Sequence, residues 1–201
     1  MSAAFDRAAA LSPEASVALY SFGRRELLDA ATAEVADYLE ELGLLGSDRA
    51  LVDIGCGVGR FERALAGRVA RIVGLDISPA MIELARRNCV GLANVDLRLS
   101  SGKDLAAIAT ASADMVLAID AFPYIVSASP ALAEIFFHDV ARALKPSGDF
   151  VVVNYSYRAD EAADRADVAR LAALNDFRVL RSDERPFVCW DGRVFHLGKE
   201  T

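Results

Sequence analysis

The 201-residue chain has few cysteines and histidines. Its three cysteines, Cys56, Cys89 and Cys189, are odd in number, and none belongs to a CxxC pair. The two histidines, His138 and His196, are far apart in the sequence. Disulfide frameworks and zinc sites normally show cysteines or histidines at short, paired spacings. We therefore expect neither, and we predict no metal site.

Long apolar runs and an excess of positive charge are also missing. No run of about 18 apolar residues occurs, and the N-terminus lacks a basic start followed by an apolar stretch. These absences predict a cytoplasmic protein without a membrane partner. The net charge of −7 provides no general positive field for a polyanion, so we also expect no nucleic-acid partner.

What the chain has is apolar material for one sizeable core. Hydrophobic residues make up 54% of it, and no internal repeat or low-complexity linker divides it. We predict one domain over 1–201, with an N-terminal helical cap (1–48), a cofactor-binding core (49–156) and a C-terminal helix and β-hairpin (157–201). The oligomeric state has no signature in the sequence.

Short β-rich runs alternate with helical patterns, which is typical of βαβ units around a parallel sheet. The expected strands lie at about 51–54, 70–76, 95–99, 114–119 and 149–155. Several are almost continuously apolar, as expected for strands covered by helices on both faces. After an expected helix at 160–174, the runs 177–180 and 193–197 are joined by a short turn-rich segment that favours an antiparallel hairpin. The prediction is a doubly wound α/β fold with a mostly parallel seven-stranded sheet and a C-terminal antiparallel hairpin.

Serine–proline pairs mark three helix starts, at 12–13, 78–79 and 129–130, because serine can cap free N–H groups and proline suits the first turn. The segment 144–148 (LKPSG) marks a helix end and a turn into the next strand. Two helical stretches, 13–29 and 31–43, precede the first strand and are candidates to cap a cofactor site.

A glycine-rich turn, DIGCGVG at 53–59, follows the first expected strand. Glycines allow a sharp turn and a close approach of ligand to backbone, although a turn without a ligand is the alternative. Asp76 follows Gly55 by 21 residues at the end of the second strand, where nucleoside-binding folds present an acid to ribose hydroxyls. The alternative for Asp76 is a solvated acid or a helix cap.

Asp53 indicates which nucleoside the turn suits. A dinucleotide site uses Gly-x-Gly-x-x-Gly aimed at a pyrophosphate, whereas this chain has Gly-x-Gly-x-Gly preceded by a carboxylate. Charges about 4 Å apart interact by roughly 4 kcal/mol at an effective dielectric of 20. A carboxylate here would repel phosphate and attract an ammonium and a sulfonium, both of which S-adenosylmethionine carries.

The motifs 52–59 and 74–78 resemble the first two motifs of the class I S-adenosylmethionine-dependent methyltransferases. The resemblance continues at 101–105, 113–119 and 144–148, and covers about 50–156. It implies a Rossmann-like methyltransferase fold with S-adenosyl-L-methionine as cofactor.

The resemblance also implies roles for single residues. Asp53, Gly55 and Gly57 would hold the methionine end, with Cys56 as a small residue that fits the turn; Asp76 and Ile77 would hold the ribose, Gly102 and Lys103 the adenine edge, and Asp120 would lie near the transferable methyl group. Many family members carry an acid soon after the glycine at 102, where this chain has Lys103.

Further cofactor candidates rest on position in the sequence. Met81 is a candidate to pack on adenine, although its helical spacing with Leu84 also suits core packing. Tyr20 and Arg24 or Arg25 precede the first strand, where a helix could fold over the cofactor and offer a cation to its carboxylate. A solvated helix face is the alternative for the arginine.

Candidate residues for the acceptor side follow the fourth and fifth strands, at the edge where a parallel sheet forms its ligand crevice. Asp120 and Tyr124 follow the fourth strand, and Tyr155 and Tyr157 follow the fifth. Asp120, Tyr124 and Tyr155 are the catalytic candidates. Asp120 could either polarise a substrate or bind the amino group of the cofactor, and aromatic packing is the alternative for the tyrosines. The loop after the fourth strand lacks the Asp/Asn-Pro-Pro-aromatic run of amino-directed methyltransferases that act on nucleic acid or glutamine, which favours a small-molecule acceptor.

The leading hypothesis is therefore an enzyme that transfers a methyl group to a small molecule by in-line displacement. Two alternatives remain open: an NAD(P)- or flavin-dependent Rossmann oxidoreductase, and a non-catalytic module that binds S-adenosylmethionine.

Overall fold

The structure, a computed structural model, describes residues 24–200 of the chain. The described residues divide into two compact units: 24–49, 55–100 and 187–191 belong to unit 1, and 50–54, 101–186 and 192–200 belong to unit 2. The single-domain organisation stays a prediction. Within the described residues, no helix is both long and apolar enough to span a bilayer.

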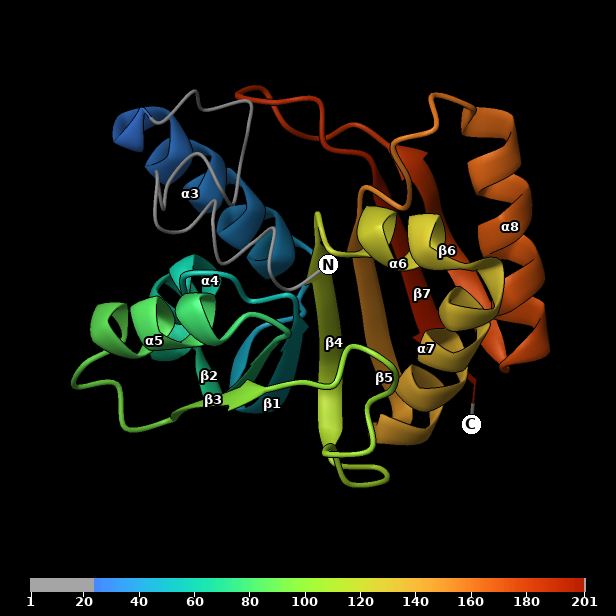
Figure 1. Cartoon of the computed structure of the whole chain (residues 1–201). Helices are drawn as coiled ribbons and strands as arrows, with labels where there is room; N and C mark the ends of the chain where they lie inside the picture. Colours follow the sequence, from blue (N-terminus) through green and yellow to red (C-terminus); the bar gives the residue numbers. More distant parts are fainter. Residues whose placement is uncertain (1–23, 201) are drawn as a thin grey trace. The chain divides into compact units, whose positions relative to one another are not determined.

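The strands form one seven-stranded sheet in the order β3-β2-β1-β4-β5-β7-β6 (Figure 1). Their bounds are β1 Gly46–Ile54, β2 Val69–Asp76, β3 Val95–Leu99, β4 Ala113–Ile119, β5 Leu144–Val153, β6 Phe177–Glu184 and β7 Val194–Lys199. The pairs β1–β4, β2–β3 and β4–β5 are parallel, whereas β7 runs antiparallel to both β5 and β6. The predicted fold class is thereby confirmed, including the antiparallel C-terminal strands.

In unit 1, helices α4 (Arg60–Leu65) and α5 (Pro79–Asn88) pack on β2, and α5 also packs on β3 (Figure 1). Helix α3 (Arg25–Glu41) packs on α4 and buries residues spaced three or four apart, such as Leu28, Ala31 and Val35. The predicted break between helices at 13–29 and 31–43 was wrong, because α3 runs through position 30. No glycine or proline occurs between 25 and 41 to stop it, and 13–23 lies outside the described residues.

Two of the predicted serine–proline helix starts are confirmed. Ser78 caps α5 by accepting a hydrogen bond from the Met81 N–H, and Ser129 caps α7 (Pro130–Ala143) by accepting from Leu132. The prolines occupy the first turn, where a missing N–H donor costs nothing. The third pair, at 12–13, lies outside the described residues.

Unit 2 is built around an aromatic core. Phe137 of α7 packs edge-to-face against Phe150 of β5 and Phe177 of β6, with ring centroids 5.3 and 6.4 Å apart. Phe122, at the start of α6 (Phe122–Ala128), is fully buried against Phe137. Helix α8 (Glu161–Leu174) packs on β6 and contacts α7, so the hairpin and these helices share one core.

The start of β5 differs from the prediction. The expected turn at 144–148 is a bulge inside the strand, because Leu144 already pairs with Ala113 before the register resumes at Asp149 and Met115. Ser147 takes a left-handed φ of 59°, and Lys145 Nζ donates to Asp114 at 2.7 Å. The bulge therefore absorbs the residues that local sequence rules assign to a turn.

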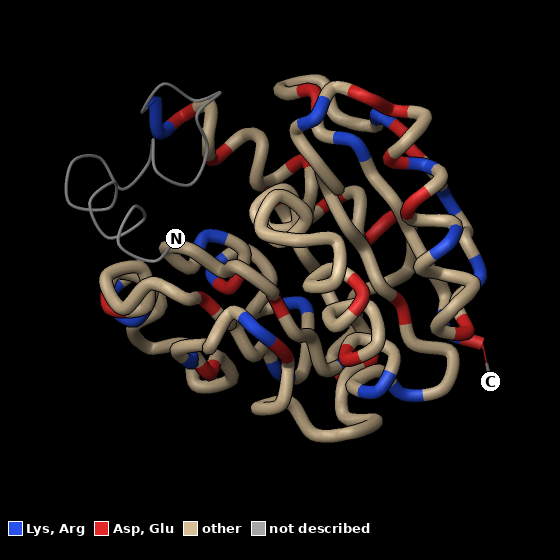
Figure 2. The backbone as a smooth tube through the Cα atoms, turned by 45° about the vertical axis from the view of Figure 1, so that its right-hand side comes forward, with Lys and Arg blue, Asp and Glu red and all other residues tan. Residues whose placement is uncertain are grey.

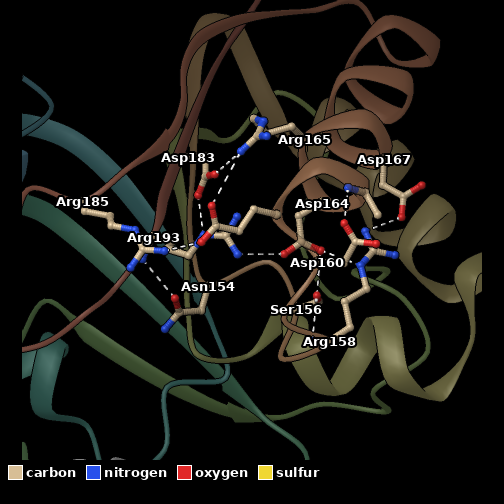
Figure 3. A network of polar contacts seen from close by, with 12 residues as sticks. Asn154, Ser156, Arg158, Asp160, Asp164, Arg165, Asp167, Asp183, Arg185 and Arg193 are labelled. Atoms are coloured by element: carbon tan, nitrogen blue, oxygen red, sulfur yellow. Dashed lines mark hydrogen bonds and ion pairs between the residues drawn. The ribbon is translucent and has the colours of Figure 1, made fainter.

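Basic and acidic residues are interspersed over α8 and β6 (Figure 2). At the inner edge of this surface, Arg193 contacts two acidic side chains, Asp183 on β6 and the buried Asp164 on α8 (Figure 3). Asp164 also accepts from Ser156 and Arg158 in the loop after β5. We call Ser156, Arg158, Asp164, Asp183 and Arg193 the Arg193 network. It joins α8, β6, the start of β7 and the loop after β5.

We expect Asp183 to make the free energy of unfolding depend on pH in the acidic range. Burial raises the pKa of its carboxyl, but hydrogen bonds from Arg193 and Arg165 outweigh burial and hold the pKa below its ordinary value. Stability from a depressed carboxyl pKa is present above the unfolded value of about 3.9 and is lost as pH falls through the folded value. We expect Asp183→Asn to lower the free energy of unfolding by about 1–3 kcal/mol at pH 7, and by less at pH 3.

Urea unfolding of both proteins at pH 7 and pH 3 measures this difference. Asp191→Asn, at an exposed position of the β6–β7 loop, is the matched control and should show little effect at either pH. A loss for Asp183→Asn that is equal at both pH values would contradict the assignment.

Candidate cofactor and acceptor site

The predicted glycine turn joins β1 to α4 and is attached to the end of β2. Gly55, Gly57 and Gly59 have left-handed φ values of 80°, 55° and 79°, which glycine adopts without steric cost. The Leu75 carbonyl accepts hydrogen bonds from the N–H groups of Gly55 and Cys56, at 2.7 and 3.0 Å. Gly55 is exposed between buried residues, so the turn presents bare backbone at that point.

Asp76 braces the same turn. Its Oδ2 accepts from the Gly57 N–H at 3.0 Å, and its Oδ1 accepts from the Ser78 N–H at 2.8 Å. The two alternatives for this acid, ligand binding and local capping, are therefore compatible, because a carboxylate has about four acceptor positions. Asp76 and its neighbour Ile77 are half-buried at the end of β2.

Beneath the turn lies a small apolar layer. Met81 is buried and packs with Val58. Cys56 is also buried, and Asn88 of α5 donates to the Val58 carbonyl at 2.9 Å. The structure thus places Met81 in the core that supports the turn, which is the packing alternative weighed from the sequence.

The remaining predicted cofactor residues have varied surroundings. Asp53 is buried in β1 beside Leu117 of β4, and Arg24 is exposed directly before α3. In unit 2, Gly102 has a left-handed φ of 69°, and the exposed Lys103 donates its backbone N–H to Ser101 Oγ. Tyr20 lies outside the described residues.

On the acceptor side, the structure brings Asp120, Tyr124 and Tyr157 together. The Tyr157 hydroxyl donates to Asp120 Oδ1 at 2.9 Å, and the Tyr124 and Tyr157 rings meet edge-to-face at 6.0 Å. Burial raises the pKa of Tyr124, and the negative charge of Asp120 raises it further. At neutral pH this phenol is therefore a neutral hydrogen-bonding group.

Tyr155 lies apart from that group. It is buried, stacks on Phe122 at 5.9 Å and meets Phe195 edge-to-face. Burial is the main cause that raises its pKa well above the ordinary range. Of the tyrosines after β5, Tyr157 is thus the one beside the carboxylate.

Asn154 was not predicted as a site residue, but its Nδ2 donates to Asp120 Oδ1 at 2.7 Å. Its only signal was an asparagine directly after an apolar strand, a position where left-handed φ is often found. The contact joins residues 34 apart in sequence, so only strand pairing could reveal it.

A family model described as "Methyltransferase domain" matches residues 52–152, which hold the glycine turn, Asp76 and Asp120. The chain belongs to the class I S-adenosylmethionine-dependent methyltransferases. The resemblance predicted from the motifs is therefore confirmed, and with it the cofactor that the family uses.

Known proteins similar to this methyltransferase chain include two groups of curated relatives. A demethylmenaquinone methyltransferase of Tropheryma whipplei (strain Twist) is 34% identical over 58% of this chain and 45% of its own length. A ubiquinone biosynthesis O-methyltransferase of Xanthomonas oryzae pv. oryzae (strain PXO99A) is 29% identical over 63% of this chain and 51% of its own. The chain spans about half the length of these relatives.

Solved structures agree on the fold of this methyltransferase chain. Magnesium protoporphyrin IX methyltransferase from Synechocystis PCC 6803, solved with bound S-adenosylmethionine, matches with a TM-score of 0.70 and 20% identity. The match covers 99% of this chain and 92% of that one. At this identity the likeness supports the fold alone.

The close approach of α5 to the turn gives a stability prediction. A Cβ added at Gly59 would lie 2.9 Å from Cys89 Sγ and 3.2 Å from the Ala85 Cα. We expect Gly59→Ala to lower the free energy of unfolding by about 2–4 kcal/mol, since left-handed strain and overpacking add.

Gly91→Ala is the matched control, because Gly91 has a φ of 87° and no atom within 4 Å of an added Cβ. It should lose only the cost of the left-handed conformation, about 1–2 kcal/mol. Urea unfolding measures both, and equal losses would show that α5 does not press on the turn.

Proposed function

We propose that this chain binds S-adenosylmethionine and transfers its methyl group to a small molecule. The observation that carries the proposal is the turn in unit 1, where Asp76 accepts the Gly57 N–H at 3.0 Å. Membership of the methyltransferase family supports it. Because the relatives are about twice as long as the matched segments, their printed substrates do not extend directly to this chain.

The groups around the turn suit a nucleoside that carries no phosphate. Exposed backbone at Gly55 allows close approach, and the half-buried Asp76 is an anionic acceptor for ribose hydroxyls. Asp53, buried just before the turn, would oppose a pyrophosphate and favour positive charge. Ile77 would add an apolar contact, and Gly102 and Lys103 would border the adenine.

Weaker assignments complete the cofactor site. In this proposal Cys56 serves as a small turn residue and Met81 as the support beneath it. Arg24 would offer a cation to the methionine carboxylate, while Tyr20, outside the described residues, stays a candidate from the sequence alone.

When bound, S-adenosylmethionine supplies an electrophilic methyl group on a sulfonium. It would supply this methyl group for direct displacement by an acceptor lone pair, with the electron pair of the broken bond left on its sulfur, and Asp53, the glycine turn and Asp76 would hold it. The chain's part is to hold the acceptor in line and to receive the proton that the acceptor loses. Asp120 is the candidate proton acceptor, with Tyr124 as a neutral hydrogen-bonding neighbour.

The acceptor class is a proposal from charge and from the relatives. The net charge of −7 disfavours a polyanionic substrate. The relatives' names describe a demethylmenaquinone methyltransferase and a ubiquinone biosynthesis O-methyltransferase, and we infer that this chain also acts on a small molecule. A cytoplasmic location without nucleic-acid or membrane partners belongs to the same proposal.

Calorimetry with S-adenosylhomocysteine and NAD distinguishes the methyltransferase from an oxidoreductase. We expect S-adenosylhomocysteine to bind and NAD to give no measurable heat, because the turn lacks the pyrophosphate-binding spacing. The reverse result would overturn the proposal. Release of S-adenosylhomocysteine from S-adenosylmethionine with a panel of small acceptors would then exclude a non-catalytic module.

Asp76 provides a second test. We expect Asp76→Ala to weaken S-adenosylhomocysteine binding by about 10- to 100-fold, because charge-assisted hydrogen bonds contribute about 1.5–3 kcal/mol. Since Asp76 also braces Gly57, the 2′-deoxy analogue of S-adenosylhomocysteine is the control ligand. The natural chain should prefer the hydroxylated ligand, and the variant should lose that preference. A preference that survives the substitution would assign Asp76 to the turn alone.

A further inference from the structure

One oxygen of the Asp120 carboxylate, Oδ1, accepts hydrogen bonds from the part-buried Asn154 amide and from the exposed Tyr157 hydroxyl. We propose that Asn154 is the positioning residue for Asp120, and that the Tyr157 hydroxyl stands where the hydroxyl group of a phenolic acceptor donates. This inference rests on the proposed function and names the acceptor class for it.

The placement begins with strand pairing. Ile119 and Val153 are the last paired residues of β4 and β5, and the Asp120 N–H continues the ladder to the Val153 carbonyl at 3.0 Å. Asp120 and Asn154 therefore leave adjacent strands side by side at their carboxyl ends. Both take left-handed φ values, 55° and 62°, which turn the chain out of the sheet. Strained backbone of this kind is often retained at functional sites.

The Asn154 amide has one possible orientation. Its Oδ1 accepts from the backbone N–H of Arg193 at 3.0 Å (Figure 3). The backbone N–H of Asn154 in turn donates to the Arg193 carbonyl at 2.8 Å. With the oxygen engaged by Arg193, the amide nitrogen must face Asp120, where the distance is 2.7 Å. The hydrogen-bond pattern thus decides which way the amide points.

Arg193 is itself fixed by the Arg193 network. Its guanidinium contacts Asp183 and Asp164, and Asp164 is only 1% exposed (Figure 3). Removing one partner from a buried charge pair is costly, so this end of β7 resists movement. The rigidity passes through Asn154 to the Asp120 carboxylate.

The Tyr157 side chain is more exposed to solvent than that of Asn154. The residue is 59% exposed in the loop after β5, and its hydroxyl donates to the same Oδ1 at 2.9 Å. Its ring meets the Tyr124 ring edge-to-face. A phenolic acceptor could replace this hydroxyl with its own at little net cost, because one phenol–carboxylate hydrogen bond exchanges for another.

The test uses protein saturated with S-adenosylhomocysteine, with calorimetric titration of 4-ethylphenol and of 4-ethylanisole, which lacks the hydroxyl. We expect the natural chain to prefer the phenol. Tyr157→Phe removes the competing hydroxyl and keeps the ring contact, so phenol affinity should rise by about 2- to 10-fold. Asn154→Asp keeps an acceptor for the backbone N–H of Arg193 but replaces the donor to Asp120 with an oxygen. Asp120 then loses its positioning hydrogen bond, so the preference for phenol should fall at least about 10-fold.

Asp160→Ala is the matched control. It removes the capping hydrogen bond from the Ala163 N–H at the end of the same loop, outside the Arg193 network and without contacting Asp120, and its preference for phenol should equal that of the natural chain. The ratio of the two affinities is the decisive readout, since general loosening of the loop would affect both ligands alike. Thermal unfolding with bound S-adenosylhomocysteine shows that each variant is folded.

If S-adenosylhomocysteine does not bind the natural chain, the proposed function fails. If it binds but no preference for phenol appears, or if Asn154→Asp keeps the preference, the further inference fails while the proposed function stands. Weaker phenol binding by Tyr157→Phe would overturn the assignment of Tyr157 as a replaceable donor.

Discussion

The hydrogen bond from the Gly57 N–H to Asp76 is the contact on which the proposed cofactor site depends. It ties a backbone turn that only glycine enters without strain to the end of the neighbouring strand β2. The Leu75 carbonyl strengthens the connection by accepting two further N–H groups. These hydrogen bonds add to the support from the buried Val58 and Cys56 and from the Asn88 side chain, and together they hold the shape of the turn.

In unit 2, side chains rather than backbone groups support the candidate site. Asp120 and Asn154 leave adjacent parallel strands, and the register of those strands decides that their side chains meet. The Arg193 network then anchors Asn154 from the C-terminal strands. The antiparallel strands β6 and β7 thus stabilise a carboxylate that the parallel part of the sheet presents, and they also complete the aromatic core.

Much of the local structure was predictable because it depends on near neighbours. Ser78 and Ser129 cap helices through N–H groups three residues away. Where local rules failed, longer contacts prevailed. The motif at 144–148 reads as a turn, but Leu144 finds a partner in Ala113 and the strand begins early. Met81 was predicted as an adenine contact or as core, and packing with Val58 depends on how α5 meets the turn.

The sequence by itself determined the family, the strand–turn–helix signature and the acid at the end of β2, since these depend on residue type at short spacing. It also placed Asp120 at a strand end. Only the tertiary structure distinguished Tyr157, beside that carboxylate, from Tyr155, inside the core, and only it revealed Asn154. The physical reason is that strand register and aromatic packing join residues tens of positions apart, and no local pattern records which of two nearby tyrosines points inward.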